Sequence, residues 1–481
     1  MLEINQKADR LIYGNPKSHV AIVTLWTKAS DVAKKLSADD YTVIGQLFSA
    51  ERGLDPLIRN LLANPQITNI VITGIDYSKS GIVLRDFFER GFYLGKKDIT
   101  ERECWRVDSK FPGYIELDIP ENVLNDLRAS IAADWINDMN KFSVSNLKKP
   151  EKTRQKMIFD KAEEKIEKKY EAEDSAFIVR HDSIAGVWLQ IIDTILKFGN
   201  PGDTHYNSSQ LEMLNLISVI SKEDPNNFHI PEFWDKTRIT EYIPRVTQDI
   251  KTPSSYTYGS RMRSWFGLDQ VQAAIDKLVR EPISRAVVIN LWDSTKDLTI
   301  GGSPCVNHVW LRIREDKLYM TVTIRSNDMF EGYPENAYGL RALQELIRKK
   351  VSEKLEKDIT LGDLVINSQS AHVYEDCFEK ARSIVDKYYH KYVMPSALQW
   401  DPRGSFYIEI TDEDIVLHHL SKSNEVIGAY SGKSAKELRD KLIRDGVVGN
   451  TAHAMYLGIE LAKAEHALKR GEEYAQDEEI K

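Results

Sequence analysis

The middle of the chain contains two strand-like runs separated by a polar turn, and this pattern constrains the fold most. The runs cover residues 309–313 and 318–324, and residues 314–317 form the turn. Runs of this length around a short polar turn predict an antiparallel β-hairpin. A hairpin brings its ends together, so Cys305 before the first strand and Arg325 after the second are expected to share one site.

The residue types at this end of the hairpin indicate covalent chemistry on an anionic ligand. A guanidinium beside a thiol lowers the thiol pKa from its free value of about 8.5, which favours the nucleophilic thiolate. Ser326 adds a hydroxyl group and Asn336 adds a carboxamide. The alternative is that Cys305 only packs in the interior, which is the commoner role of a lone cysteine.

The same stretch resembles the catalytic core of the thymidylate synthase family. In that family Pro-Cys-His precedes a hairpin, and Arg-Ser-x-Asp and Gly-x-Pro-Phe-Asn follow it. Two positions depart from the family: Val306 replaces the histidine after the cysteine, and Glu335 replaces the phenylalanine before the asparagine. The residues that match at the family's spacing are Cys305, Arg325, Ser326, Asp328, Gly332, Pro334 and Asn336.

Further motifs resemble the same family. Residues 258–265 resemble Tyr-Gly-x-x-x-Arg-x-Trp, and residues 370–374 resemble Asp-Ala-His-x-Tyr. Residues 282–292 resemble a strand whose paired arginines reach into the neighbouring subunit's active site, although only Arg285 is present because Ala286 takes the second position. The resemblance implies a thymidylate-synthase-like α+β domain over residues 175–393 that forms a homodimer.

The resemblance also implies catalytic roles. Cys305 is expected to add to C6 of a pyrimidine ring, which makes C5 nucleophilic. Glu212 is expected to act as the general acid/base, and Tyr258 to assist proton removal at C5. Asn336 is expected to read the base edge, because a carboxamide complements uracil whereas an aspartate suits cytosine.

Ligand-binding roles follow from the same resemblance. The expected assignments are Arg325, Ser326 and the partner's Arg285 for the phosphate, His372 and Tyr374 for the sugar, and Asp328 for the reduced pterin. The phosphate arginine that the family carries after its first helix is not recognisable in residues 202–206. Arg263 and Thr204 are the candidates to replace it.

Together these roles predict that the protein methylates dUMP at C5 to give dTMP, without a metal. The expected one-carbon donor is methylene-tetrahydrofolate or methylene-tetrahydromethanopterin. A dUMP or dCMP hydroxymethyltransferase of the same fold is an alternative, because Val306, Glu335 and the unrecognisable closing tail bear on how the pterin is bound. A non-catalytic nucleotide-binding or regulatory protein is a third alternative, against which the retained site residues count.

Residues 1–146 are predicted to form a small α/β domain. Buried-strand patterns alternate with helical patterns, which favours a parallel sheet; these segments are 20–26, 54–62, 70–73 and 82–90. Ligands of such sheets bind at the carboxyl ends of the strands, here near residues 24–27 and 74–81.

The segment through Gly74 resembles the cytoplasmic domain of the corrinoid-carrying subunit of the tetrahydromethanopterin S-methyltransferase complex. That family follows its strand with a Gly-His pair that supplies the cobalt ligand, whereas residues 77–81 contain no histidine. Cobalt needs an imidazole or a similarly basic donor. Corrinoid binding is therefore not expected, and the domain is predicted to be repurposed or structural.

Two other segments complete the chain. Residues 147–174 are dense in Lys and Glu and are predicted to form a solvated helical linker. Residues 394–481 are predicted to form a small α+β domain of unknown role, and its patterns are strands at 400–410 and 416–420 and a helix at 451–470. His453 and His466 have no carboxylate or cysteine at ligand spacing, so no metal site is expected there.

Charge and cysteine content argue against several functions. The 481-residue chain has a net charge of −8, which disfavours polynucleotide binding as its main task. Its three cysteines are too scattered for a disulfide framework or a zinc site. No signal peptide or membrane-length apolar run is recognisable, so a cytoplasmic protein without a membrane partner is expected. The predicted fold class is thus a multidomain α/β and α+β protein.

Overall fold

The computed structural model describes nine ranges of the chain. They are residues 11–76, 78–98, 102–147, 152–159, 170–203, 209–251, 256–299, 302–393 and 401–478. The chain divides into two compact units, one with residues 1–184 and 191–384, the other with residues 185–190 and 385–481. Several sheets and helices are present, which confirms the predicted multidomain α/β and α+β fold class.

The N-terminal sheet has the predicted parallel core. Its strand order is β1 (Ile12–Tyr13), β3 (Val43–Gly45), β2 (Val20–Val23), β4 (Asn69–Ile72) and β8 (Ala132–Trp135). Strands β3, β2, β4 and β8 are parallel, and only the edge strand β1 is antiparallel. The central strands β2 and β4 are the two that the sequence predicts, because continuous apolar runs mark strands buried on both faces.

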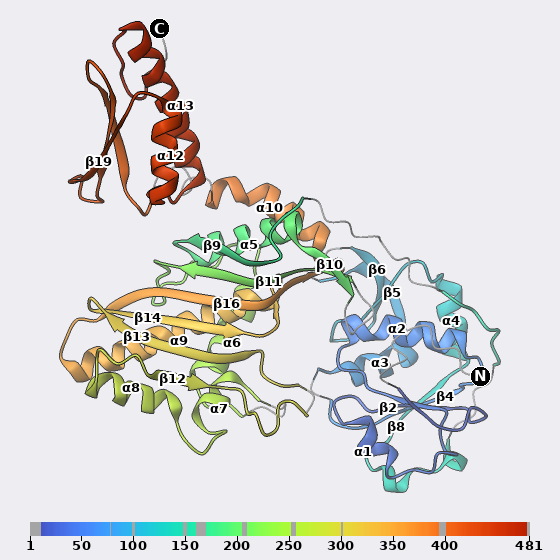
Figure 1. Ribbon diagram of the computed structural model, residues 1–481. Coiled ribbons are helices and arrows are strands. Elements are labelled where there is room, and N and C mark those ends of the chain that lie inside the picture. Colours follow the sequence, from blue (N-terminus) through green and yellow to red (C-terminus); the bar gives the residue numbers. More distant parts are fainter. Residues whose placement is uncertain are drawn as a thin grey trace. The chain divides into compact units, whose positions relative to one another are not determined.

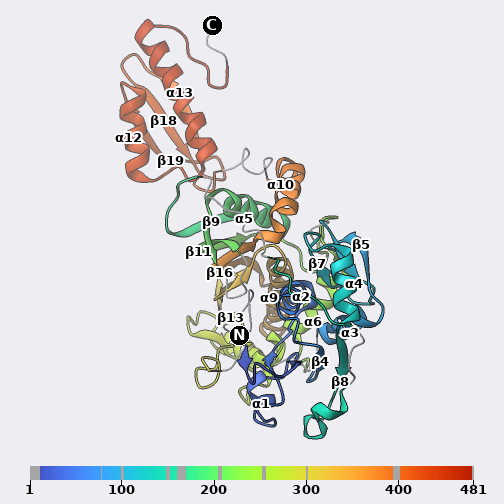
Figure 2. The same ribbon diagram turned by 90° about the vertical axis from the view of Figure 1, so that its right-hand side faces the viewer.

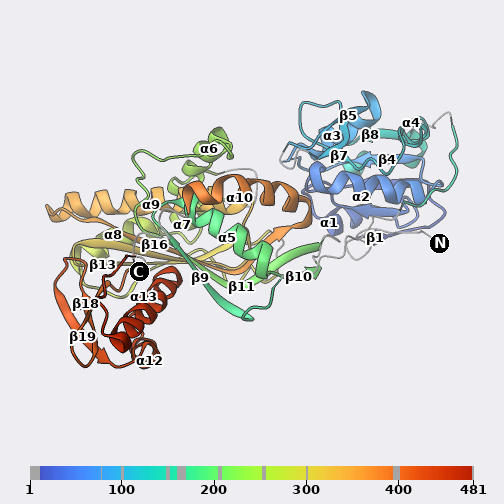
Figure 3. The same cartoon turned by 90° about the horizontal axis from the view of Figure 1, so that it is seen from above.

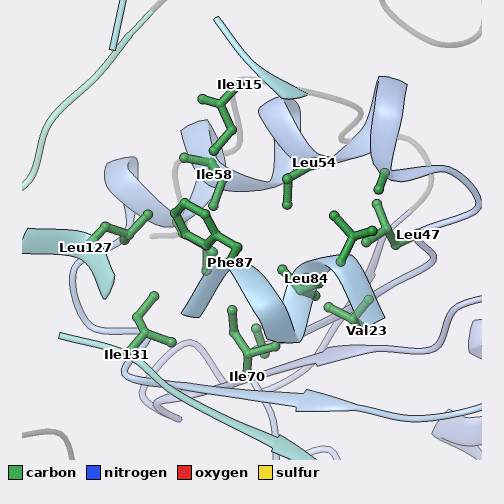
Figure 4. Packing of buried hydrophobic residues seen from close by; sticks show 14 of the residues in the cluster. Val23, Leu47, Leu54, Ile58, Ile70, Leu84, Phe87, Ile115, Leu127 and Ile131 are labelled. Carbon is green, nitrogen blue, oxygen red and sulfur yellow. The ribbon is translucent and has the colours of Figure 1, made fainter. Parts of the chain in front are cut away.

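Helices cover both faces of this sheet (Figures 1 and 2). Alternate residues of β2 divide between two cores: Ala21 and Val23 face the larger core, and Val20 and Ile22 face the smaller one. Figure 4 shows the larger core, in which Leu54 and other apolar residues from α2 and α3 meet the sheet. The helices are α1 (Ala29–Ala33), α2 (Ala50–Ala63), α3 (Ser80–Glu89) and α4 (Glu121–Ala129).

A small antiparallel sheet completes this domain and was not predicted. It consists of β5 (Phe92–Lys96), β6 (Glu103–Val107) and β7 (Tyr114–Ile115). Two short 3₁₀ helices follow β8, at Met139–Lys141 and Val144–Asn146.

The predicted helical linker is not observed over residues 152–159, which have no regular secondary structure. These residues run against the N-terminal domain: Met157 and Phe159 pack on its larger core. Arg154 donates hydrogen bonds to the carbonyl oxygens of Leu61 and Asn64. Tertiary packing therefore overrides the helical charge pattern here, and residues 160–169 lie outside the described ranges.

The catalytic domain predicted from the sequence is built on an eight-stranded sheet. The strand order is β10 (Asn200–Asp203), β11 (Ser209–Ile220), β16 (Thr360–Tyr374), β14 (Lys317–Ile324), β13 (Val306–Arg314) and β12 (Val287–Asn290). Strand β9 (Ser175–His181) pairs with β11, and β15 (Asn327–Asp328) pairs with β16. The predicted hairpin is β13–β14, and its turn residues Glu315 and Asp316 have φ values of 51° and 55°, as a type I′ turn requires.

One face of this sheet is covered by helices (Figure 3). Residues Leu318, Met320, Val322 and Ile324 alternate along β14 and are buried. Gln344 of α9 donates a hydrogen bond to the carbonyl oxygen of Leu318, which fixes this helix over the strand. The helices of this part of the chain are α5 (Ile184–Phe198), α6 (Lys236–Thr247), α7 (Tyr258–Arg263), α8 (Gln270–Arg280), α9 (Gly332–Leu355) and α10 (Phe378–Tyr392).

The C-terminal domain is a three-stranded antiparallel sheet with two helices on one face (Figures 1 and 3). Its elements are β17 (Ser405–Ile410), β18 (Ile415–Leu420), β19 (Val426–Gly432), α12 (Ala435–Asp445) and α13 (Thr451–Arg470). The predicted strands and the helix at 451–470 are confirmed, whereas β19 and α12 were not predicted. Among the described residues of the whole chain, no helix has both the length and the apolarity that a bilayer crossing requires.

Candidate active site

The hairpin brings Cys305 and Arg325 together, as predicted from their positions at its two ends. The backbone N–H of Arg325 donates to the carbonyl oxygen of Cys305 at 2.9 Å. The Arg325 side chain donates to the carbonyl oxygens of Pro304 at 3.1 Å and Ser303 at 2.9 Å. The guanidinium is therefore held on the loop that carries the cysteine.

The expected lowering of the Cys305 pKa is not observed. Burial raises the pKa of the half-buried thiol, and the nearby Arg325 charge lowers it by less than burial raises it. The prediction from the sequence was wrong in direction because it counted the guanidinium and not the desolvation, which disfavours a thiolate. Cys305 in the free protein is thus a thiol that must lose its proton before it can attack.

Three tyrosines lie close enough to this cysteine to interact with it electrostatically. Burial raises the pKa of Tyr258, and the negative charge of a Cys305 thiolate would raise it further. Burial followed by the Cys305 charge raises the pKa of Tyr256, and burial followed by the Glu335 charge raises the pKa of Tyr242. The Tyr256 hydroxyl also donates to the carbonyl oxygen of Ser303 at 3.1 Å. The sequence analysis did not identify Tyr242 and Tyr256 as site residues. Both lie far from Cys305 along the chain, and neither belongs to a motif that indicates contact with it.

Local structure holds Tyr258 in place at the start of α7. Thr257 and Ser260 form a reciprocal capping box, with both backbone-to-hydroxyl hydrogen bonds at 3.0 Å. Gly259 lies so close to α6 that a Cβ atom there would be 1.8 Å from the carbonyl oxygen of Gln248. The glycine of this motif is therefore required by the packing of α7 against α6.

Asn336 lies in the first turn of α9 and is 6% exposed. Its Oδ1 atom accepts from the Tyr242 hydroxyl at 2.9 Å, and its Nδ2 atom donates to Asn327 at 3.2 Å. Asn327 in turn donates to the Ser368 hydroxyl at 3.0 Å. These bonds orient the carboxamide and leave it the capacity for one more acceptance and one more donation, which is what a base edge requires.

Glu212, His372 and Asp328 form a row across three neighbouring strands. His372 of β16 is the Cα partner of Glu212 on one side and of Asp328 on the other. The Ser370 hydroxyl donates to Glu212 and lies 3.4 Å from Nδ1 of His372. Burial lowers the pKa of His372, so the neutral imidazole is favoured. The ring of Tyr374 meets the His372 ring edge to face, with centroids 5.0 Å apart.

Of the residues expected to bind phosphate, Ser326 lies next to the hairpin end that carries Arg325, whereas Arg285 lies far from Cys305 of the same chain. Ser326 directly follows Arg325 and is half-buried. Arg285 is exposed and lies just before β12, in which Val287 pairs with Leu311 of β13. At about 3.3 Å per strand residue, this register separates Arg285 from Cys305 by roughly 25 Å. The structure therefore does not bring Arg285 to the cysteine of its own chain.

The candidates for the missing phosphate arginine receive no support from the structure. The Arg263 guanidinium pairs with Asp269 at 2.9 Å and donates to the carbonyl oxygen of Thr247 at 3.1 Å. Arg263 is thus engaged in holding α7 and α8. Thr204 lies outside the described residues.

The two carboxylate oxygens of Asp328, the residue expected to hold the reduced pterin, have different surroundings. Its Oδ1 atom accepts from the backbone N–H groups of Phe330 and Glu331, at 3.0 and 3.1 Å. Its Oδ2 atom lies 3.7 Å from a guanidinium nitrogen of Arg52, too far for a hydrogen bond, and the side chain is 20% exposed. The second oxygen can therefore accept a hydrogen bond from a ligand.

Arg52 belongs to α2 of the N-terminal domain, and no sequence motif connected it with this site. Its guanidinium lies 3.2 Å from Glu331 and 3.8 Å from Asp376. It also stacks 4.4 Å above the centroid of the Tyr374 ring. Within the described residues, no group of three or more His, Cys, Asp or Glu side chains is arranged to hold a metal ion.

Comparison with known families agrees with this geometry. The family model described as thymidylate synthase matches residues 204–426, so the match extends beyond the predicted boundary at 393. A second model, described as PterinBD-DUF4346, matches residues 400–477, the segment to which the sequence assigned no role.

Curated relatives from methanogenic archaea match the same part of the chain, and each is named "Putative thymidylate synthase". The relative from Methanosarcina barkeri is 32% identical over 212 residues, which cover 43% of this chain and 94% of the relative. The relative from Methanococcoides burtonii is 31% identical with the same coverage. The relative from Methanothermobacter marburgensis is 28% identical over 225 residues, covering 44% of this chain and 98% of the relative.

Proposed function

Because the chain belongs to the thymidylate synthase family and is a one-carbon transferase, we propose that it methylates C5 of dUMP to give dTMP. The observation that carries this proposal is the placement of Cys305 beside Arg325 and near the buried Tyr258. A nucleophile, a cation for the phosphate and groups that transfer protons are the parts that this reaction needs.

In the proposed mechanism the Cys305 sulfur forms a bond to C6 of the uracil ring. The electron pair of the C5–C6 double bond moves towards O4, and C5 becomes nucleophilic. Glu212 protonates O4 and orders water at that position. Once C5 has bonded to the one-carbon unit that a bound pterin would supply, Tyr258 assists removal of the C5 proton, and the bond from sulfur to C6 breaks as the C5–C6 double bond re-forms.

A reduced pterin of the folate or methanopterin type supplies the one-carbon unit when it is bound, and for methylation it also supplies the hydride. Asp328 is the residue proposed to hold it, through the carboxylate oxygen that lies beyond hydrogen-bond distance of Arg52. Asn336 is proposed to hold the uracil edge, and His372 and Tyr374 the sugar. Arg325 and Ser326 are proposed to bind the phosphate together with the partner's Arg285.

The uncovered face of the large sheet supports a homodimer. Val288, Trp310, Thr321 and Val365 are successive Cα partners across four strands of this face. Val288 is 45% exposed although it is apolar. The Trp310 indole donates to the carbonyl oxygen of Arg285, so Arg285 lies beside this face. A two-fold contact here would let each Arg285 approach the neighbouring subunit.

The direct test is incubation of the full-length protein with dUMP and either methylene-tetrahydrofolate or methylene-tetrahydromethanopterin, followed by identification of both products. Formation of dTMP together with the oxidised dihydropterin supports methylation. Recovery of unchanged dUMP with both one-carbon donors would overturn the proposal.

A second candidate is hydroxymethylation of dUMP or dCMP, and Glu335 favours it. This carboxylate replaces an aromatic residue of the family and pairs with Arg238 next to Asn336. Burial raises the pKa of Glu335, and Arg238 lowers it by less. Polar groups at this position can hold a water molecule that attacks the exocyclic methylene carbon. Recovery of 5-hydroxymethyl nucleotide with tetrahydropterin that is not oxidised would identify this reaction.

A further inference from the structure

The N-terminal domain contains a cavity of about 780 Å³ between β2, β3 and α2. Its lining includes residues just beyond the carboxyl ends of the strands, because Trp26 follows β2 and Phe48 follows β3. This position agrees with the sequence expectation for residues 24–27, whereas none of the described residues 74–76 and 78–81 lines the cavity. The volume lies within the range of roughly 300–1,000 Å³ that is typical of small-molecule sites.

The walls of the cavity are mainly apolar and aromatic. Leu57 of α2 lines its interior, and Trp26 and Phe48 form an edge-to-face pair with ring centroids 5.1 Å apart. The Gln46 amide, also in the wall, is occupied because it donates to the carbonyl oxygen of Thr27 at 2.9 Å. Such walls suit a neutral aromatic group, which gains burial and ring contacts without requiring many hydrogen bonds.

The cavity is connected with the candidate active site through two of its lining residues. Tyr374, which also lines the cavity, ends β16 two residues after His372. Arg52 lines the cavity and extends to Asp328, which lies 3.7 Å from its guanidinium. A single ligand could therefore contact Asp328 with a polar ring system and the N-terminal cavity with an apolar extension.

The charges around the connection indicate which part of a ligand fits there. Arg52 is surrounded by the carboxylates of Asp328, Glu331 and Asp376, so the cluster is net negative when all of them are ionised. An anionic tail would be repelled at this point, whereas a neutral aryl group would not. The carboxylates and the apolar walls together select a molecule with a hydrogen-bonding ring at one end and a neutral aromatic ring next to it.

We infer that the N-terminal cavity forms the outer part of the one-carbon donor site and takes the aryl group that is attached to the reduced pterin ring. This inference rests on the proposed function for the identity of the ligand. It gives the N-terminal domain a role in ligand binding that does not involve cobalt. Trp26, Phe48 and Leu57 would contact the aryl group, and Arg52 would connect the cavity with Asp328.

The test fills the cavity and compares pterins with and without the aryl group. Leu57→Trp places an indole in the cavity from within α2, and Ser49→Trp does so from the lining residue that directly precedes α2. Glu89→Trp is the matched control, because residue 89 ends α3 and is exposed. Dissociation constants are measured by anaerobic calorimetry for tetrahydrofolate, tetrahydromethanopterin and 6-methyltetrahydropterin, each in the presence of dUMP. Thermal melting verifies that each variant is folded.

We expect Leu57→Trp and Ser49→Trp to weaken binding of the aryl-bearing pterins tenfold or more. Binding of dUMP and of 6-methyltetrahydropterin, which lacks the aryl group, should change less than twofold, and Glu89→Trp should change nothing. Equal weakening of all three pterins, unchanged binding of the aryl-bearing pterins, or wild-type protein that binds neither of them would overturn the inference.

Failure of the proposed function gives a different result. If wild-type protein leaves dUMP unchanged but the filled variants selectively lose the aryl-bearing pterins, the methylation proposal fails and the cavity assignment stands. If dTMP forms at the same Michaelis constant for the one-carbon donor in wild type and in both folded variants, the cavity assignment alone fails.

Discussion

The guanidinium of Arg52 in the N-terminal domain lies 3.2 Å from the Glu331 carboxylate, directly before α9 of the catalytic domain. Burial and the nearby Asp328 charge raise the pKa of Glu331 to about 7, although Arg52 and Arg238 lower it. The two domains thus meet at a carboxylate that titrates near neutral pH. This contact couples the protonation of one residue to the packing of both domains.

Glu331 should make stability depend on pH. Its pKa is higher in the folded state than the ordinary value of 4.5, so the folded protein binds the proton more tightly than the unfolded chain does. This contribution to the unfolding free energy is complete below about pH 4.5 and is lost as the pH rises through about 7. The difference in melting temperature, wild type minus Glu331→Gln, should therefore decrease as the pH is raised from about 5 to about 8. The same comparison in an Arg52→Gln background should show the fall at higher pH, because the Arg52 guanidinium lowers the pKa of Glu331. A difference that rises with pH would contradict the assignment.

Cys305→Ser should abolish turnover and leave dUMP affinity within about twofold of wild type. The residues proposed to hold the base, sugar and phosphate are other side chains, so the nucleotide should still bind when the nucleophile is lost. Product analysis and calorimetric titration with dUMP measure the two effects separately. Substantial dTMP formation by the variant would remove the covalent mechanism.

Alkylation of Cys305 by iodoacetamide should report its raised pKa. Burial raises the pKa of this thiol, so the pH of half-maximal reactivity should exceed the free-thiol value of about 8.5. Arg325→Gln should raise that pH further and slow alkylation at pH 8, because the guanidinium lowers the thiol pKa. Arg314→Gln, at the far end of the same hairpin, should have no effect. Mass spectrometry of the Cys305 peptide separates its rate from those of the buried Cys104 and Cys377. A midpoint well below 8.5 would indicate a preformed thiolate instead.

Asn336→Asp should shift base preference from dUMP towards dCMP. The carboxylate can accept from the cytosine amino group, but it can donate neither to O4 of uracil nor to Asn327, to which Asn336 now donates at 3.2 Å. Loss of a buried hydrogen-bond partner costs about 1–3 kcal/mol, or about 5- to 150-fold in dUMP affinity. Titrations with both nucleotides provide the measurement, and Asn125→Asp on the exposed side of α4 in the N-terminal domain is the control. Parallel loss of both nucleotides would mean that Asn336 only holds the fold.

Mixed dimers should reveal whether the site is shared between subunits. Cys305→Ser protein and Arg285→Glu protein are each expected to be inactive alone. If Arg285 acts on the neighbouring subunit, a mixed dimer has one site with both defects and one with neither, so activity returns in part. If Arg285 acts within its own chain, every site in the mixture carries a defect. A mixture that stays inactive, with subunit exchange confirmed by differently tagged chains, would refute the shared site.

The sequence by itself determined the hairpin and the central strands of the N-terminal sheet, because these depend on local patterns. The polar turn at 314–317 and the continuous apolar runs at 20–26 and 70–73 leave few alternatives to the observed strands. The meeting of Cys305 with Arg325 follows from the hairpin alone. The helix at 451–470 was likewise determined by its local pattern.

Only the tertiary structure decided the environment of those residues. The direction of the Cys305 pKa depends on how deeply the thiol is buried, and burial is a sum over segments that are distant in sequence. Tyr242 and Asn327 orient Asn336, yet neither belongs to a motif near it. Arg52 reaches Glu331 although 279 positions separate the two residues. Residues 152–159, whose charge pattern predicted a helix, instead run without regular secondary structure against the N-terminal core, because packing there outweighs the weak local preference.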